Sequence, residues 1–236
     1  MTLLVISDIH LKPWRFHRAS ELIKEYDAEC AVCLMDIADD WGKQKDVALY
    51  RETYDAAINF AKEHPSSLWC YGNHDLSYVW HKMQSGYSIY AAPIVTEKIR
   101  ELKTVLSDEQ RLAYVHRIDD VLFSHGGVTE EFVRDNAPSI LYDDTDAVIH
   151  ELNNLNQEAM WRDNSPIWAR PQYGSVRMYQ GEKLLQVVGH TPVKAIQQEG
   201  NLISCDVFAN CSDETASEDP AYLLLNTKTW EWKGVR

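Results

Sequence analysis

Five short segments of the chain carry side chains that can bind metal ions, and each follows an apolar run. Carboxylate and imidazole groups together suit manganese, iron and zinc. Because the strands of an open α/β sheet end at one edge, where ligands bind, we expect the segments to meet there. They are Asp8-x-His10, Asp36-x-x-Asp39, Gly72-Asn73-His74-Asp75, Ser124-His125-Gly126-Gly127 and Gly189-His190-Thr191-Pro192.

Asp8 and His10 lie on one side of an extended backbone, because side chains alternate along a strand. One cation can therefore contact both a carboxylate oxygen and an imidazole nitrogen. A pair of this kind on its own is more typical of a solvated loop after a strand. The four accompanying segments reverse that preference and favour a metal site.

These segments, in this order and at these separations, resemble the calcineurin-like metallophosphoesterase superfamily over residues 8–192. The family pattern is D-x-H, G-D-x-x-D, G-N-H-D/E, a later His, and G-H-x-H or G-H-T-P. The Gly-Gly after His125 and the Gly-His-Thr-Pro segment are most similar to the serine/threonine phosphoprotein phosphatase branch and its bacterial relatives. The resemblance implies an α/β fold: a metallophosphoesterase sandwich of two mixed β-sheets flanked by helices.

The resemblance also implies two metal ions that share one ligand, Asp36. Such ions, about 3.5–4 Å apart, lower the pKa of a bridging water and neutralise phosphoryl oxygens, so that hydroxide attacks phosphorus directly. The expected cofactors are two divalent or mixed-valence ions, with manganese, iron or zinc suited to nitrogen and oxygen ligands. The implied ligands are Asp8, His10 and Asp36 for the first ion, and Asp36, Asn73, His125 and His190 for the second.

His74 and Asp39 are the residues to which the resemblance assigns proton transfer. His74 resembles the general acid that protonates the leaving oxygen, and Asp39 the carboxylate that orients it. Asp75 is a second candidate for the orienting role. The alternative interpretations are a hydrogen-bonded loop histidine for His74 and a helix cap or surface acid for Asp39.

Three positions depart from the family pattern. Met35 stands where many relatives have Gly before the bridging Asp, and Pro192 stands at the second His of G-H-x-H, which favours the phosphatase-like variant over many phosphodiesterases. Asp40 stands where phosphoprotein phosphatases carry an arginine that binds the substrate phosphate. An acid there repels a phosphate dianion unless it points away. A different cation is then needed to bind the phosphate.

Arg162, the first choice, and Arg170 are the candidate substrate-binding residues, because they lie between the last two histidine segments. That region supplies a phosphate-binding arginine in the phosphoprotein phosphatase branch, and the planar guanidinium matches phosphate geometry. For Arg162 a surface arginine paired with Asp163 or Glu158 is an equal alternative.

The elements that must position these residues follow from hydrophobic periodicity. In the first half, strands predicted at 2–7, 31–35 and 68–71 alternate with helices at 17–27 and 46–63, which implies parallel strands joined by crossovers. In the second half, two runs around a turn at 119–120 suggest an antiparallel pair, and the remainder mixes helices, a loop-rich stretch and strands. The predicted segments are a helix at 94–106, strands at 112–115 and 121–123, helices at 128–135 and 144–158, loops at 162–183, and strands at 184–188, 201–206, 221–226 and 229–233, with a polar loop at 212–219.

Length and composition are those of a soluble globular protein, with 45% hydrophobic and 25% charged residues. The chain suits one α/β domain over residues 1–236. Its formal net charge of -13 disfavours extended nucleic acid as a partner. The apolar run 3–6 has no basic leader and is too short for a signal peptide or a membrane span, which predicts a cytoplasmic protein without membrane attachment.

The cysteines favour reduced core thiols, because their number is odd and most lie in apolar runs. Cys30 and Cys33 form a C-x-x-C pair, but residues three apart in a strand face opposite sides, which disfavours a zinc or redox site. The five cysteines are Cys30, Cys33, Cys70, Cys205 and Cys211.

The sequence therefore predicts a dinuclear metal-dependent phosphoesterase that hydrolyses a phosphomonoester, either a phosphoprotein or a small metabolite. A dinucleoside polyphosphate hydrolase or a phosphodiesterase on the same metal core is the alternative. A non-catalytic scaffold of this fold is less favoured, because all the implied ligands and His74 are present. The substrate, the native metals and the oligomeric state stay open at this point.

Overall fold

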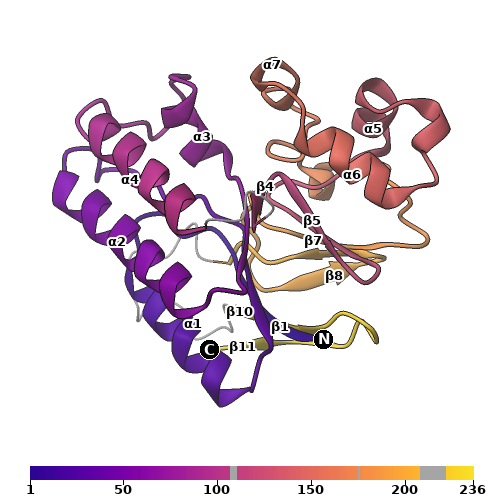
Figure 1. Ribbon diagram of the computed structural model, residues 1–236, viewed down its shortest axis with the longest axis horizontal. Helices are drawn as coiled ribbons and strands as arrows, with labels where there is room; N and C mark the ends of the chain where they lie inside the picture. The colour runs from indigo at the N-terminus through magenta and orange to yellow at the C-terminus, as the bar shows by residue number, and fades with distance from the viewer. Residues whose placement is uncertain (107–110, 175, 208–221) are drawn as a thin grey trace.

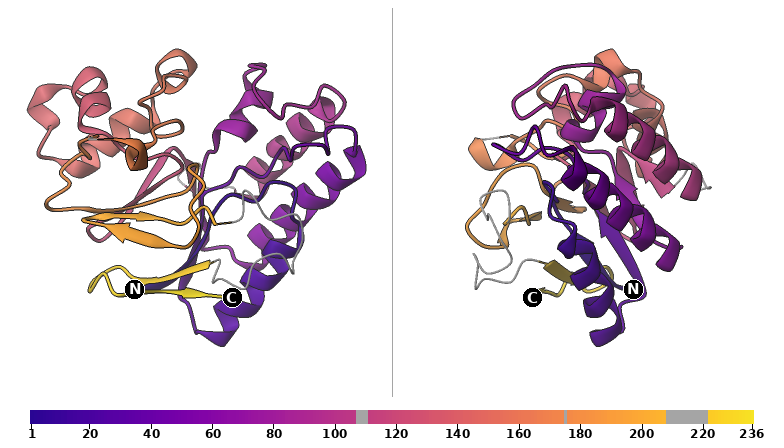
Figure 2. Two further views of the ribbon diagram at one scale, coloured as in Figure 1. Left: turned by 180° about the vertical axis from the view of Figure 1, so that it is seen from behind. Right: turned by 90° about the vertical axis from the view of Figure 1, so that its left-hand side faces the viewer.

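Two mixed β-sheets form the centre of the molecule, with helices on both outer sides (Figure 1). The same layering is visible from behind (Figure 2). The predicted fold class, an α/β sandwich of two mixed sheets flanked by helices, is thus confirmed. Cys211 and the predicted loop 212–219 lie outside the described residues. The computed structural model describes residues 1–106, 111–174, 176–207 and 222–236.

The first sheet contains the strands of the N-terminal half and the last two strands of the chain. They are β1 (Thr2–Ile6), β2 (Cys30–Cys33), β3 (Leu68–Cys70), β4 (Leu112–Ala113), β10 (Tyr222–Asn226) and β11 (Trp232–Val235). Their order is β11-β10-β1-β2-β3-β4. The pairs from β1 to β4 are parallel, as the predicted crossovers require, and β10 and β11 are antiparallel additions.

The second sheet contains the strands that follow. They are β5 (Val115–Ile118), β6 (Val121–Ser124), β7 (Leu185–Val188), β8 (Gln197–Glu199) and β9 (Leu202–Ser204). Their order is β5-β6-β7-β9-β8, with β6, β7 and β9 parallel and β5 and β8 antiparallel at the edges. Each sheet thus has a parallel centre whose strands end at the same edge.

The helices connect the parallel strands and fall into two groups (Figure 1). In the part of the chain that the structure describes, four α-helices connect strands of the first sheet, and three lie between β6 and β7 of the second sheet. Among the described residues no helix combines the length and the apolar character that a membrane crossing requires. The helices are α1 (Trp14–Glu25), α2 (Val47–Glu63), α3 (Asn73–Val79), α4 (Ala92–Val105), α5 (Glu130–Asn136), α6 (Thr145–Asn153) and α7 (Gln157–Met160).

Three hydrophobic layers hold the sandwich together, because alternate side chains of each strand face opposite sides. In β1, Leu4 packs with α1, α2 and α4 on the outer face, whereas Val5 packs with Phe123 and Val187 of the second sheet. A third layer lies between the second sheet and α5 and α6. Cys30 and Cys33 fall into different layers, as predicted from strand alternation.

The predicted strand 112–115 is wrong as a single strand, because the chain passes from one sheet to the other at Tyr114. The predicted antiparallel pair around the turn 119–120 is present as β5 and β6. Leu112 and Ala113 pair with β3, whereas Val115 pairs with Ser124 of β6. The side chain of Asn153 accepts hydrogen bonds from the amides of Tyr114 and Val115, which stabilises the transfer. Periodicity cannot reveal such a transfer, since both halves of the run are extended.

Other boundaries also differ from prediction. The predicted helix 144–158 is divided, because α6 ends at Asn153 and Asn156 caps α7 by accepting from the Ala159 amide at 3.0 Å. The last strand begins at Trp232 rather than at 229. Two short elements, α3 and β8, were not predicted; α3 begins within the Gly-Asn-His-Asp segment itself.

Candidate active site

The five predicted segments converge at the ends of parallel strands from both sheets. Asp8 follows β1, Asp36 follows β2, and Asn73 is the first residue of α3 after β3. His125 follows β6 and His190 follows β7. Two groups of possible ligands, each with its ligand atoms within 4.8 Å of one another, form here, and both contain Asp36: Asp8, His10 and Asp36; and Asp36, His125 and His190.

The backbone around the ligands adopts conformations that residues other than glycine rarely enter. Such strained conformations gather at functional sites, where the surrounding structure enforces them. Met35, which stands where many relatives have Gly, keeps the left-handed turn with a φ of 54°. The substitution therefore leaves the turn before Asp36 intact. The other ligand-loop residues with positive φ are His10, Leu11, Asp36, Asp39 and His190.

Gly72 and Gly189 permit the carboxylates of the site to lie directly against the backbone. A Cβ atom at Gly72 would overlap Oδ1 of Asp36, and a Cβ atom at Gly189 would overlap Oδ2 of Asp8. Neither glycine has a positive φ, so the need for glycine here is space rather than conformation.

Asp36 lies at the centre of the site and is buried. Its Oδ1 accepts a hydrogen bond from the His74 amide at 2.9 Å, and its Oδ2 lies 3.1 Å from Nε2 of His125. Burial by itself raises the pKa of Asp36, but the charges of His125 and His74 outweigh it, and the pKa is lowered. Asp36 is therefore ionised at neutral pH, as a shared metal ligand must be.

Two histidines of the site, His10 and His125, are oriented by backbone carbonyls, an arrangement typical of metal ligands. His10 donates from Nδ1 to the Asp39 carbonyl at 2.8 Å, and His125 donates from Nδ1 to the Leu34 carbonyl at 2.9 Å. In the neutral form of each ring, Nε2 then carries the lone pair. Nε2 of His125 lies 3.0 Å from Oδ1 of Asn73 and 3.1 Å from Nδ1 of His190. Lone pairs from several side chains thus point to one place.

An unpaired, buried carboxylate oxygen indicates that the residues present fit a metal ion. Among the residues that the structure describes, Oδ2 of Asp8 and Nε2 of His190 are buried without a hydrogen-bond partner. Burial of an unpaired polar atom costs about 1–3 kcal/mol. A cation would satisfy Oδ2 of Asp8, whereas the nitrogen of His190 that faces His125 is Nδ1 and not the unpartnered Nε2. The mixture of carboxylate and imidazole suits manganese, iron or zinc.

His74 and Asp39 form a buried pair beside the two ligand groups. Nδ1 of His74 lies 2.8 Å from Oδ2 of Asp39, while Oδ1 of Asp39 accepts from the hydroxyls of Tyr50, at 2.8 Å, and Tyr78. Burial lowers the pKa of His74, but the charge of Asp36 and the bond to Asp39 outweigh it and raise the pKa. The alternative of a surface acid or helix cap for Asp39 is wrong: the residue is fully buried, and Asp46 caps α2.

Asp75 does not orient His74, the role for which the sequence suggested it as a second candidate. Its carboxylate accepts from the backbone amide of Ile37 at 3.2 Å and from the hydroxyl of Tyr54 at 2.6 Å. It therefore holds the loop that carries Asp36, whereas the carboxylate on Nδ1 of His74 is that of Asp39. The sequence did not predict that Tyr50 and Tyr78 bind Asp39 or that Tyr54 binds Asp75. The only signal was the four-residue spacing of Tyr50 and Tyr54, which places both on one face of α2.

Three basic side chains near the site differ in how deeply they are buried and in what they contact. Lys12 is buried, donates to the His10 carbonyl at 3.0 Å and lies 3.6 Å from Asp40, so the acid at the unusual position is paired. Arg170 is half-buried and donates from Nη1 to the His190 carbonyl at 2.9 Å. Arg162 is exposed. Of the two predicted arginines, only Arg170 contacts a segment of the site in the described residues.

A model of the calcineurin-like phosphoesterase family matches residues 1–217, so the chain belongs to that family, and the resemblance seen in the sequence is confirmed. It is a metal-dependent phosphoric ester hydrolase. The chain is similar to the crystal structure of a cold-active protein-tyrosine phosphatase of the psychrophile Shewanella sp., with a TM-score of 0.58 and 16% identity over 100% of this chain and 80% of that chain.

A second solved structure of a cold-active protein tyrosine phosphatase gives a TM-score of 0.56 and 16% identity over 95% of this chain and 73% of that chain. At this identity the likenesses show a shared fold. A comparison with curated proteins finds no match.

Proposed function

We propose that this chain hydrolyses a phosphomonoester with two metal ions, the first bound by Asp8, His10 and Asp36 and the second by Asp36, Asn73, His125 and His190. The observation that carries the proposal is the meeting of two buried ligand groups at Asp36, with a His–Asp pair beside them. When bound, such ions supply charge stabilisation for the phosphoryl oxygens and acidify a water molecule.

His74 is the proton donor to the leaving oxygen in this proposal. Asp39 holds Nδ1 of the ring, so Nε2 is the atom that can give up a proton. The pKa of His74 is raised by the charge of Asp36 and the bond to Asp39, which favours the protonated ring that a general acid requires. Tyr50 and Tyr78 keep Asp39 in place by donating to its other oxygen, so they act as positioning residues.

Arg170 is the proposed phosphate-binding cation. It lies beside His190, whereas Arg162 is exposed, and a guanidinium can hold two phosphate oxygens at once. The pairing of Asp40 with Lys12 reduces the repulsion that an unpaired acid would exert on a phosphate dianion. Both observations support a phosphomonoester, from a phosphoprotein or a small metabolite, as the substrate.

The test compares four substrates on metal-stripped protein to which manganese is returned. They are para-nitrophenyl phosphate, its bis ester, a phosphopeptide and diadenosine tetraphosphate. We expect manganese-dependent turnover that is fastest on a monoester. Faster hydrolysis of the bis ester or of diadenosine tetraphosphate would instead establish the corresponding alternative, and no metal-dependent turnover of any of the four would exclude the proposal.

A further inference from the structure

Trp41 is an exposed aromatic residue at the edge of the candidate site. It follows Asp39 and Asp40 in the loop between β2 and α2, and 51% of its surface is exposed. The centre of its ring lies 5.6 Å from that of His10 and 5.7 Å from that of His74. A large apolar side chain is thus held in water next to a proposed metal ligand and the proposed proton donor.

The indole is held by a second loop rather than by the core. Nε1 of Trp41 donates to Oγ of Ser85 at 3.0 Å. The loop of Ser85 is itself fixed against the site, because a Cβ atom at Gly86 would lie 3.2 Å from Cβ of Asp39 and 3.5 Å from Cε1 of His74. Trp41 therefore has a defined orientation, although half of its surface is exposed.

We infer that Trp41 determines substrate specificity by stacking on an aromatic ring of the leaving group, so that the preferred substrates are aryl and arylmethyl phosphomonoesters. The inference rests on the proposed function, since it requires the leaving oxygen to lie at His74. Aromatic rings attract one another at centroid distances of about 4.5–7 Å. A ring joined to the leaving oxygen directly or through one carbon falls within that range of the indole, because Trp41 and His74 are already in contact.

The same geometry should make the site prefer an aryl or arylmethyl leaving group to a nucleoside. In a nucleoside monophosphate a ribose separates the base from the leaving oxygen, so the ring lies farther from His74 than the indole of Trp41 does. A simple alkyl group has no π face to stack. The loss of the indole should therefore reduce hydrolysis of an arylmethyl phosphate more than that of an alkyl phosphate or a nucleotide.

The experiment measures kcat/KM of the manganese-loaded full chain on benzyl phosphate, butyl phosphate and adenosine 5′-monophosphate. Benzyl and butyl phosphate both release a primary alcohol, so the need for proton donation is similar. For Trp41→Leu we expect the ratio of benzyl to butyl phosphate to fall roughly three- to tenfold, the worth of one aromatic pair. Trp41→Phe keeps a ring and should retain most of the ratio.

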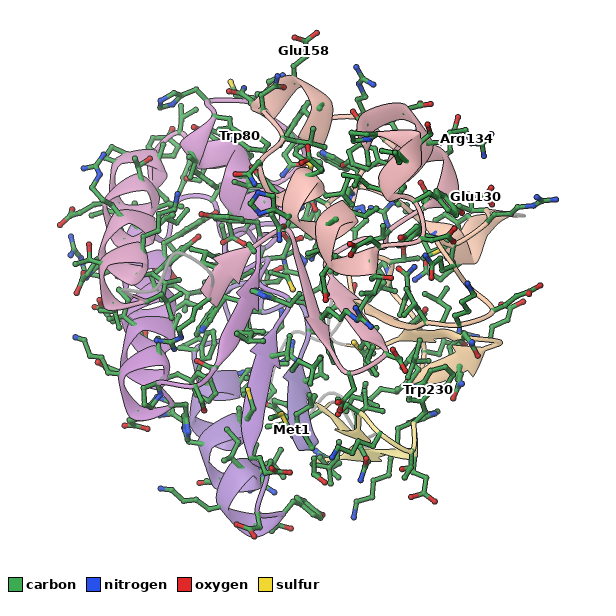
Figure 3. The ribbon with its side chains drawn as sticks, turned by 45° about the vertical axis from the view of Figure 1, so that its right-hand side comes forward. Met1, Trp80, Glu130, Arg134, Glu158 and Trp230 are labelled. Carbon is green, nitrogen blue, oxygen red and sulfur yellow. The ribbon has the colours of Figure 1, made fainter. Side chains whose placement is uncertain are left out.

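The matched control is Trp230→Leu. Trp230 lies in the turn between β10 and β11, in the lower part of Figure 3 with Met1, whereas Trp80 at the end of α3 lies at the top. This variant should keep the wild-type ratio. Manganese content of each variant shows whether the site itself has changed.

Three outcomes overturn the inference: an equal loss on benzyl and butyl phosphate in Trp41→Leu, a loss largest on the nucleotide, or a Trp41→Phe variant as unselective as Trp41→Leu. Absence of activity in the wild type on all three substrates would instead count against the proposed function. The two failures are therefore distinguishable.

Discussion

Replacement of Asp36 by Asn should remove both metal ions at once. Asp36 belongs to both ligand groups, and Asn keeps its size and its acceptor for the His74 amide. What changes is the charge. Attraction between a carboxylate and a unit charge about 4 Å away is about 4 kcal/mol at an effective dielectric constant of about 20. That energy corresponds to roughly a thousandfold in affinity for each ion.

The assay is metal content after gel filtration, together with kcat/KM on para-nitrophenyl phosphate. We expect Asp36→Asn to retain little manganese and to lose at least about a thousandfold in kcat/KM. Asp40→Asn is the matched control, because the same chemical change is made four residues away in an acid that pairs with Lys12. Two tightly bound ions or normal activity in Asp36→Asn would refute the assignment of the shared ligand.

Three other predictions concern the proton donor, the glycines and the phosphate-binding cation. His74→Asn should spare manganese content, slow hydrolysis of alkyl phosphates by about 10²–10⁴-fold and have less effect on para-nitrophenyl phosphate, which needs little protonation. Because Asp36 and Asp39 raise the pKa of His74, the wild-type rate on alkyl phosphates should fall as pH rises through that raised pKa. If His74→Asn showed the same fall in rate at alkaline pH, His74 would not be the proton donor. Gly189→Ala should destabilise the fold by about 1–3 kcal/mol and reduce metal content, because the new methyl overlaps Asp8. Gly174→Ala is the control, because a methyl there meets nothing within 4 Å. Equal midpoints of urea unfolding for the two variants would be inconsistent with the close approach of Asp8 to Gly189. Arg170→Ala should lower kcat/KM roughly tenfold to a hundredfold, the worth of a charged hydrogen bond, and Arg162→Ala about twofold or less; the reverse order of the two losses would exchange their roles.

The sequence by itself determined the family, the fold class and the segments that meet at the site. These depend on local features: apolar runs with a period of two or 3.6, and ligand side chains directly after strands. Parallel pairing within a sheet places neighbouring strand ends at one edge, so Asp8 and Asp36 had to come together once β1 and β2 were parallel, and His125 and His190 once β6 and β7 were parallel.

The tertiary structure decided what those side chains contact. Asp39 and Asp75 are both acids next to the site, but only their hydrogen bonds in the folded chain show that Asp39 holds His74 and Asp75 holds the Asp36 loop. The transfer at Tyr114 and the contact of Trp41 with His74 likewise join segments far apart in the chain. Periodicity reports which side of an element is buried, whereas the choice of partner depends on long-range packing, which no local pattern contains.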